Sequence, residues 1–85
     1  MNKTEFLILS ILVANNATSK MSGMTAKDIL SSENLQYKDN TFYKQLKGLS
    51  ELGLVGIGAK EVRTLTFYIT KSGIQKLKEE KEDEE

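Results

Sequence analysis

The segment that decides the fold is residues 39–59, which read DNTFYKQLKGLSELGLVGIGA. Its first part has a helical pattern, because apolar side chains recur at steps of four, three and three residues, at Phe42, Leu46, Leu49 and Leu52. Asp39 or Asn40 stands where it could cap the amino end of this helix. Gly53 follows the last apolar position, where helices commonly end on a residue with left-handed backbone. We therefore predict a helix that buries one face and ends at Gly53.

Beyond this helix the hydrophobic period changes from helical to alternating. Residues 54–59 predict a weak strand, and its inward side would carry Val55, Ile57 and Ala59. Residues 64–70 alternate more strongly, with apolar side chains at Leu65, Phe67 and Ile69. The intervening residues 60–63 are mostly charged, which is typical of a hairpin tip. This part of the chain therefore predicts a two-stranded wing.

A short helix is predicted upstream, opening at Thr25 and ending within residues 31–34. Thr25 can cap it, and Asp28 three residues later completes a short-chained version of the capping box. Residues 15–23 before it are polar and contain glycine, which indicates a loop. Two helices joined by a turn, the second one capped, form the helix-turn-helix pattern.

Residues 4–14 predict the first helix of the chain, which Thr4 could cap. Its apolar side chains lie on almost every face rather than along one stripe. A helix that is apolar all round must be buried on several sides. Dimerisation through this helix would satisfy that need, and so would a central position in the core of one chain. The sequence leaves both arrangements open.

A last helix is predicted after the second strand, with Thr70 or Ser72 as its cap and with Ile74 and Leu77 facing inward. The order is then three helices, a two-stranded wing and a C-terminal helix. This order predicts an α+β, mainly helical fold of the winged helix-turn-helix type.

Charge is divided unevenly along the chain. Residues 1–78 hold eleven of the twelve basic side chains and six of the twelve acidic ones, a net charge of +5, and residues 79–85 carry −5. We therefore predict a winged-helix domain over residues 1–78 and an acidic tail, frayed or disordered, over residues 79–85. Such a tail either solubilises the protein or imitates nucleic acid and competes for the basic face.

The composition argues against most other classes of protein. The chain has 85 residues, 39% of them hydrophobic and 28% charged, which is typical of one globular domain. It contains no Cys and no His, so it lacks the commonest zinc ligands and the usual acid–base group near neutral pH. Its longest apolar stretch, residues 6–14, falls far short of the roughly 20 residues of a membrane helix. We therefore expect a cytoplasmic protein that is not an enzyme and binds no cofactor or metal.

The chain resembles a known group of regulators between residues 41 and 77. Thr41-Phe42-Tyr43, the spaced Leu46 and Leu49, and Gly53-Leu54-Val55 resemble the recognition-helix stretch of PadR-type transcriptional regulators. Phe67-Tyr68-Ile69-Thr70 with Gly73 is similar to the end of the wing in PadR-like and MarR-like winged helices. The resemblance implies sequence-specific binding of double-stranded DNA by a homodimer.

The candidate DNA-binding residues lie on the outward side of the predicted recognition helix and at the hairpin tip. They are Lys38, Asn40, Thr41, Tyr43, Lys44, Lys47, Lys60 and Arg63. Asn40 can pair with adenine and Lys44 with guanine. Tyr43 and Lys47 suit contacts to phosphate. The alternative for these positions is an ordinary solvated helix face.

Two functions remain open at this stage. The leading hypothesis is a homodimeric regulator that binds double-stranded DNA, either a repressor or a factor controlling plasmid or phage replication or partition. The second is a winged-helix module that binds protein instead of DNA. The net charge of zero, a pI of about 6.3 and Glu51 on the outward side favour the second, because dedicated DNA-binding domains are often far more basic.

Overall fold

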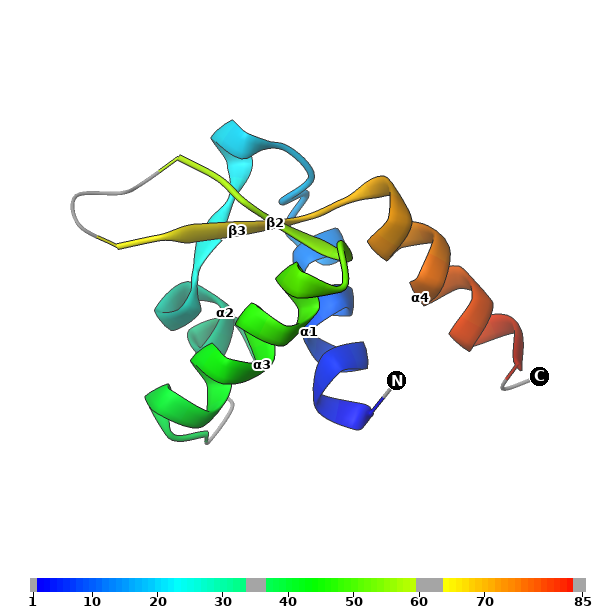
Figure 1. The fold of residues 1–85 in the computed structure, drawn as a ribbon, viewed down its shortest axis with the longest axis horizontal. Helices are drawn as coiled ribbons and strands as arrows, with labels where there is room; N and C mark the ends of the chain where they lie inside the picture. Colours follow the sequence, from blue (N-terminus) through cyan, green and yellow to red (C-terminus); the bar gives the residue numbers. More distant parts are fainter. Residues whose placement is uncertain (1, 34–36, 60–63, 84–85) are drawn as a thin grey trace.

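The computed structural model describes residues 2–33, 37–59 and 64–83. Its elements follow the predicted order, with a short strand added before the second helix (Figure 1). They are α1 (Lys3–Ala14), the 3-10 turn η1 (Lys20–Ser22), β1 (Met24–Thr25), α2 (Ala26–Ser32), α3 (Asp39–Glu51), β2 (Val55–Ile57), β3 (Thr66–Ile69) and α4 (Lys71–Asp83). This arrangement confirms the α+β, mainly helical, winged helix-turn-helix fold.

The sheet has three strands where the sequence predicted two. Its order is β1-β3-β2, and both strand pairs are antiparallel. Phe67 on β3 pairs with Met24 on one side and with Ile57 on the other, so β3 is the central strand. The third strand escaped prediction because β1 is two residues long and has no alternation that a pattern could reveal. The wing is thereby joined to the segment that precedes α2.

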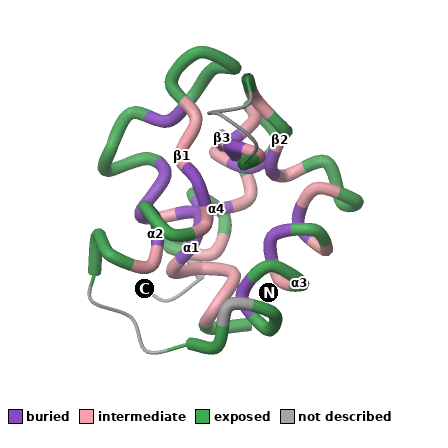
Figure 2. Tube along the Cα trace, turned by 90° about the vertical axis from the view of Figure 1, so that its left-hand side faces the viewer, coloured by how far each residue is buried: buried purple, intermediate pink, exposed green. Residues whose placement is uncertain are grey.

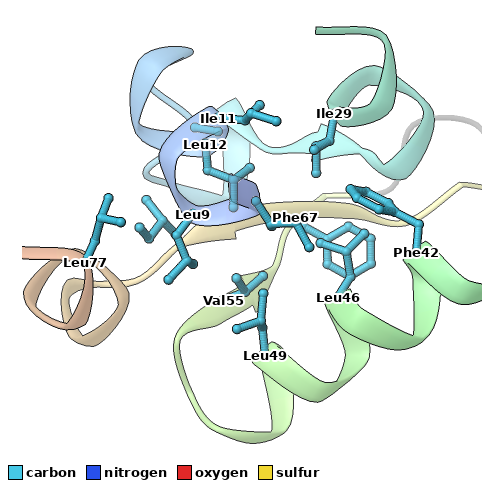
Figure 3. Packing of buried hydrophobic residues seen from close by; sticks show 13 residues of the cluster. Leu9, Ile11, Leu12, Ile29, Phe42, Leu46, Leu49, Val55, Phe67 and Leu77 are labelled. Atoms are coloured by element: carbon cyan, nitrogen blue, oxygen red, sulfur yellow. The ribbon is translucent and has the colours of Figure 1, made fainter. Parts of the chain in front are cut away.

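α1 lies in the centre of the molecule and contacts α2, α3, α4 and β3 (Figures 1 and 2). Figure 3 shows Leu9 of α1 beside Leu77 of α4, with Phe67 of β3 and the leucines of α3 on the other side of the cluster. The buried core consists of Ile8, Leu9, Ile11, Leu12, Ala17, Ile29, Phe42, Leu46, Leu49, Val55, Phe67, Ile69 and Leu77. The all-round apolar pattern of α1 is thus explained by a central position within one chain.

Two predicted helix starts are wrong, and α1 is the first. This helix begins at Lys3, and Asn2 caps it by accepting from the Glu5 amide at 2.8 Å. The Glu5 carboxylate accepts from the Asn2 amide at 3.1 Å, which completes a capping box. Thr4, the predicted cap, lies inside the first turn, where its hydroxyl shares a hydrogen bond of 3.1 Å with the hydroxyl of Tyr37.

The predicted cap of α3 is also wrong. Asp39 and Asn40 are the first two residues of the helix, and the capping position belongs to Lys38, which makes no side-chain cap. The first helical bond runs from the Phe42 amide to the Lys38 carbonyl at 3.0 Å. The helix starts earlier than expected because its buried positions, and not a polar cap, determine its length.

The predicted starts of α2 and α4 and the end of α3 are confirmed. Thr25 and Asp28 form the capping box of α2, with the Asp28 amide 3.1 Å from the Thr25 hydroxyl. Thr70, rather than Ser72, stands at the start of α4, where its hydroxyl accepts from the Gly73 amide at 3.0 Å. Gly53 has a φ of 77°, the left-handed conformation expected where α3 ends.

The burial of the wing strands departs from strict alternation. Phe67 and Ile69 are buried as predicted, but Thr66, which should face outward, is only 5% exposed. The reason is that β3 is central, and the chain around η1 covers its second face. Ile57 and Ala59, predicted to face inward, are exposed, and Ala59 lies beyond the last residue of β2.

The described part of the acidic segment is helical. α4 continues past residue 78 to Asp83, and residues 84–85 lie outside the described residues. Within this helix Lys76 Nζ lies 3.6 Å from Glu80 Oε1, one turn away. Figure 1 shows the acidic end of α4 and the amino end of α3 on opposite sides of the molecule.

Candidate nucleic-acid interface

One side of α3 is exposed and polar, whereas the other is buried in the core; we call the exposed side the free side. Phe42, Leu46 and Leu49 have no exposed surface, and Figure 2 shows α3 at the edge of the molecule. The predicted residues on and before this helix are all exposed: Lys38, Asn40, Thr41, Tyr43, Lys44 and Lys47. The free side therefore combines amide, hydroxyl and ammonium groups, which are the donors that proteins use toward base edges and phosphates.

The amino end of α3 is held by contacts to its aromatic residues. The ring of Tyr37 packs on the ring of Phe42, with centroids 5.8 Å apart. Its hydroxyl reaches the hydroxyl of Thr4 in the first turn of α1. These contacts fix the entry into α3 relative to the central helix, although Lys38 provides no side-chain cap.

Tyr43 contacts the wing as well as lying on the exposed side of α3. Its ring meets the edge of the Phe67 ring at a centroid distance of 6.1 Å, and the residue stays 38% exposed. The aromatic body of Tyr43 therefore packs on the central strand of the wing, and the residue also contributes to the exposed side of α3. The recognition helix and the wing are thus in direct contact.

The middle of α3 has a place where the backbone is open to a close approach. A Cβ added to Gly48 would meet nothing within 4 Å, so no neighbour inside the protein requires glycine there. One turn further on, Leu52 is 67% exposed, and Glu51 beside it is exposed as well. The basic side chains of the free side, the last of which is Lys47, therefore precede its carboxyl-terminal end, where Glu51 and Leu52 are exposed.

The predicted wing contacts, Lys60 and Arg63, lie outside the described residues. The structure describes the chain on both sides of them, up to Ala59 and again from Thr64. The Ala59 amide donates to the Lys20 carbonyl at 3.0 Å, which ties the base of the wing to η1.

Two further lysines are exposed in segments outside α3 and the wing. Lys20 is exposed on η1, beside the base of the wing, and Lys27 is exposed in the first turn of α2. A lone lysine in a polar loop carries no signal of its spatial neighbours, so the place of Lys20 could not be found from the sequence.

Other kinds of site find no support in the residues that the structure describes. Among them, no group of three or more acidic side chains could hold a metal ion. Within the same ranges, no helix is both long enough and apolar enough to cross a bilayer.

Comparison with known proteins decides the family. No protein-family model matches the chain. The DNA-binding protein TubR of Clostridium botulinum C phage, however, is 35% identical over 77 residues, which cover 91% of this chain and 93% of that protein. The chain belongs to the TubR family.

Solved structures of TubR proteins have the same fold. The solution structure of the DNA-binding TubR fragment from Clostridium botulinum is 34% identical, has a TM-score of 0.71, and matches 93% of this chain and 95% of its own length. TubR from Bacillus megaterium pBM400 has a TM-score of 0.75 at 23% identity, over 88% of this chain and 80% of that one. This TubR-family chain is therefore a winged-helix protein, and the resemblance to PadR-type regulators is not confirmed at the level of the family.

Proposed function

We propose that this TubR-family protein binds double-stranded DNA and acts as a regulator. The observation that carries the proposal is the division of α3 into a fully buried apolar side and an exposed side with Asn40, Thr41 and Lys44 near its amino end. In helix-turn-helix proteins this end of the second helix contacts base edges in the major groove. The DNA-binding character of the C. botulinum relative supports it.

Each candidate residue then has a role that its chemistry allows. Asn40 reads adenine and Lys44 reads guanine, because an amide and an ammonium group match the edges of those bases. The exposed hydroxyl and ammonium groups that flank them contact the phosphate backbone. These backbone contacts are assigned to Lys38, Thr41, Tyr43 and Lys47, and to Lys60 and Arg63 of the wing.

A homodimer is part of the proposal. A two-fold dimer would read an inverted repeat with half-sites about one helical turn apart, roughly 34–36 Å, or a multiple of it. α1 and α4 pack against each other, and Val13 on α1 is 38% exposed while Phe6 and Ile74 are half-buried. This surface is the proposed subunit contact, through the first helix and the C-terminal helix. Sedimentation of the full chain at several concentrations measures the association.

The biological role follows from DNA binding and is part of the same proposal. A protein of this kind acts either as a repressor or in the control of plasmid or phage replication or partition. Catalysis and a cofactor play no part in it. A cytoplasmic location and a closer kinship to PadR-type regulators stay predictions.

The second candidate, a winged-helix module that binds protein, is favoured by one feature of α3. Its carboxyl-terminal half exposes Leu52 and Glu51, an apolar and an acidic group that have no use against a phosphate backbone.

One experiment separates the two functions. The full chain is incubated at low salt with a pool of randomised duplexes, and bound molecules are amplified and sequenced. Enrichment of an inverted repeat supports the DNA-binding function. Absence of any binding at low salt overturns it and leaves the protein-binding module.

A further inference from the structure

Three segments of the chain meet at the hydroxyl group of Thr66. This residue is 5% exposed, and its hydroxyl donates a hydrogen bond to the carbonyl of Ala59, which lies just after β2. The Gly58 amide donates to the Thr66 carbonyl at 2.9 Å, and the Ala59 amide donates to the Lys20 carbonyl at 3.0 Å. We call this arrangement of Lys20, Gly58, Ala59 and Thr66 the wing-base junction.

Two glycines make room for the junction. A Cβ on Gly23 would come within 2.8 Å of Thr66 Oγ1. A Cβ on Gly58 would come within 2.7 Å of the same oxygen and within 2.6 Å of the Lys20 carbonyl oxygen. Contacts this short force the neighbouring atoms to move, so the close approach of η1, β3 and the end of β2 depends on both glycines.

The junction lies on the opposite side of the wing from the recognition helix. Phe67, the next residue along β3, points into the core and meets Tyr43 of α3, whereas neighbouring side chains of a strand point to opposite faces. The base of the wing therefore contacts α3 through Phe67, and on its other side Thr66 holds Ala59, which is bonded to Lys20 of η1.

We propose that Thr66 is a positioning residue for DNA binding: its buried hydroxyl holds the carbonyl of Ala59, whose amide is bonded to Lys20 of η1, and so fixes the base of the wing on the rest of the protein. The proposal rests on the DNA-binding function proposed above. A contact surface that is already ordered binds more tightly than one that must be ordered on binding. Thr66 therefore acts on affinity without touching DNA itself.

The test compares Thr66→Val, which keeps the shape and removes the hydroxyl, with Thr66→Ser, which keeps the hydroxyl. Far-UV circular dichroism and urea titration establish that both variants fold. We expect Thr66→Val to bind a selected duplex about fivefold more weakly, the equivalent of about 1 kcal/mol for one neutral hydrogen bond, and Thr66→Ser to bind like the parent protein. Equal affinities for all three proteins would overturn the proposal.

Double variants distinguish positioning of the wing from a general loss of structure. In an Arg63→Ala background the wing contact is already reduced, so Thr66→Val should add less than about a twofold loss. In a Lys44→Ala background, where only the α3 contact is removed, it should still cause the full loss of about fivefold. The same loss in both backgrounds would show that Thr66 acts through overall stability and would overturn the proposal.

Two further controls keep the result interpretable. If Thr66→Val fails to fold, Gly23→Ala is tested instead, because its added Cβ presses on Thr66 Oγ1 from the other side. Gly23→Ala should add little loss of DNA affinity in the Arg63→Ala background and the full loss in the Lys44→Ala background. The reverse result would overturn the proposal. If the parent protein binds no duplex, the proposed function itself is refuted. If the parent binds and Thr66→Val has the same affinity, only the role of Thr66 is refuted.

Discussion

The ring of Tyr43 on α3 meets the ring of Phe67 on β3 edge to face, with 6.1 Å between their centroids. This pair is a direct contact between the recognition helix and the wing, and it joins a half-exposed residue to a fully buried one. Since Phe67 belongs to the central strand of the sheet, the contact joins α3 directly to the described strands of the wing.

Replacing Tyr43 separates its two contributions. Tyr43→Ala removes the ring and should lower the free energy of unfolding by about 1 kcal/mol, the usual worth of an aromatic pair, and also weaken DNA binding. Tyr43→Phe keeps the ring, so we expect the parent stability with a modest loss of affinity from the missing hydroxyl. Urea titration and fluorescence anisotropy measure the two quantities. Equal stability of both variants would contradict the structural role of the pair.

The helical frame of this fold was predictable because its signals are local. The spacing of Phe42, Leu46 and Leu49 predicted α3, and Gly53 predicted its end. Thr25 with Asp28 predicted the start of α2. In each case the residues that carry the signal lie within one or two turns of one another, where helical periodicity and capping chemistry act.

The errors arise where distant segments decide the structure. Thr66 is buried because η1, more than forty residues away in sequence, covers it, so the strand alternation misassigned this residue. The start of α3 was misplaced because burial of Phe42 outweighs the preference of Asp39 and Asn40 for a cap. The sequence does not distinguish a core position from a dimer surface for α1, because an all-round apolar pattern indicates only that the helix is buried on several sides.

The candidate interface was predicted in part for the same reason. Exposure of Lys44 and Lys47 follows from the helical rotation that buries Phe42, and the structure has both exposed. The contact of Tyr43 with the wing and the junction at Thr66 depend on tertiary neighbours, which no local pattern contains.

Lys44→Ala should alter sequence preference as well as affinity. Lys44 is exposed near the amino end of α3, where side chains reach base edges, so its loss should cost about 1–3 kcal/mol on duplexes with the preferred base and less on others. Lys78→Ala on the exposed side of α4 is the matched control and should leave binding unchanged. Anisotropy titrations with a set of single-base variants of the selected duplex give the comparison. A uniform loss across all duplexes would assign Lys44 to the phosphate backbone.

Arg63→Ala should show the complementary behaviour. A wing residue that contacts phosphate carries no sequence information, so its loss should weaken binding to every duplex by a similar factor and reduce the salt slope by about one. The same set of single-base variants serves here. A loss confined to particular base changes would place Arg63 on base edges and reverse the assignment of roles.

Binding should weaken steeply with salt. With about four phosphate contacts from each protomer of a dimer, the slope of log affinity against log salt concentration should be about −7. Titrations at several salt concentrations with the selected duplex measure it. A slope shallower than about −2 would mean that few phosphates are contacted, and it would contradict the basic face assigned to α3 and the wing.

Gly48→Ala should stabilise the protein and impair its binding. The added Cβ meets nothing within 4 Å, and alanine is favoured over glycine inside a helix, so the free energy of unfolding should rise by about 0.5–1 kcal/mol. The same Cβ projects from the free part of α3, so it should obstruct a partner that approaches the helix backbone. Gly53→Ala is the matched control, because its φ of 77° makes alanine strained by about 1 kcal/mol and should lower stability. A Gly48→Ala protein that is more stable and binds DNA as tightly as the parent would show that no close approach occurs at this position.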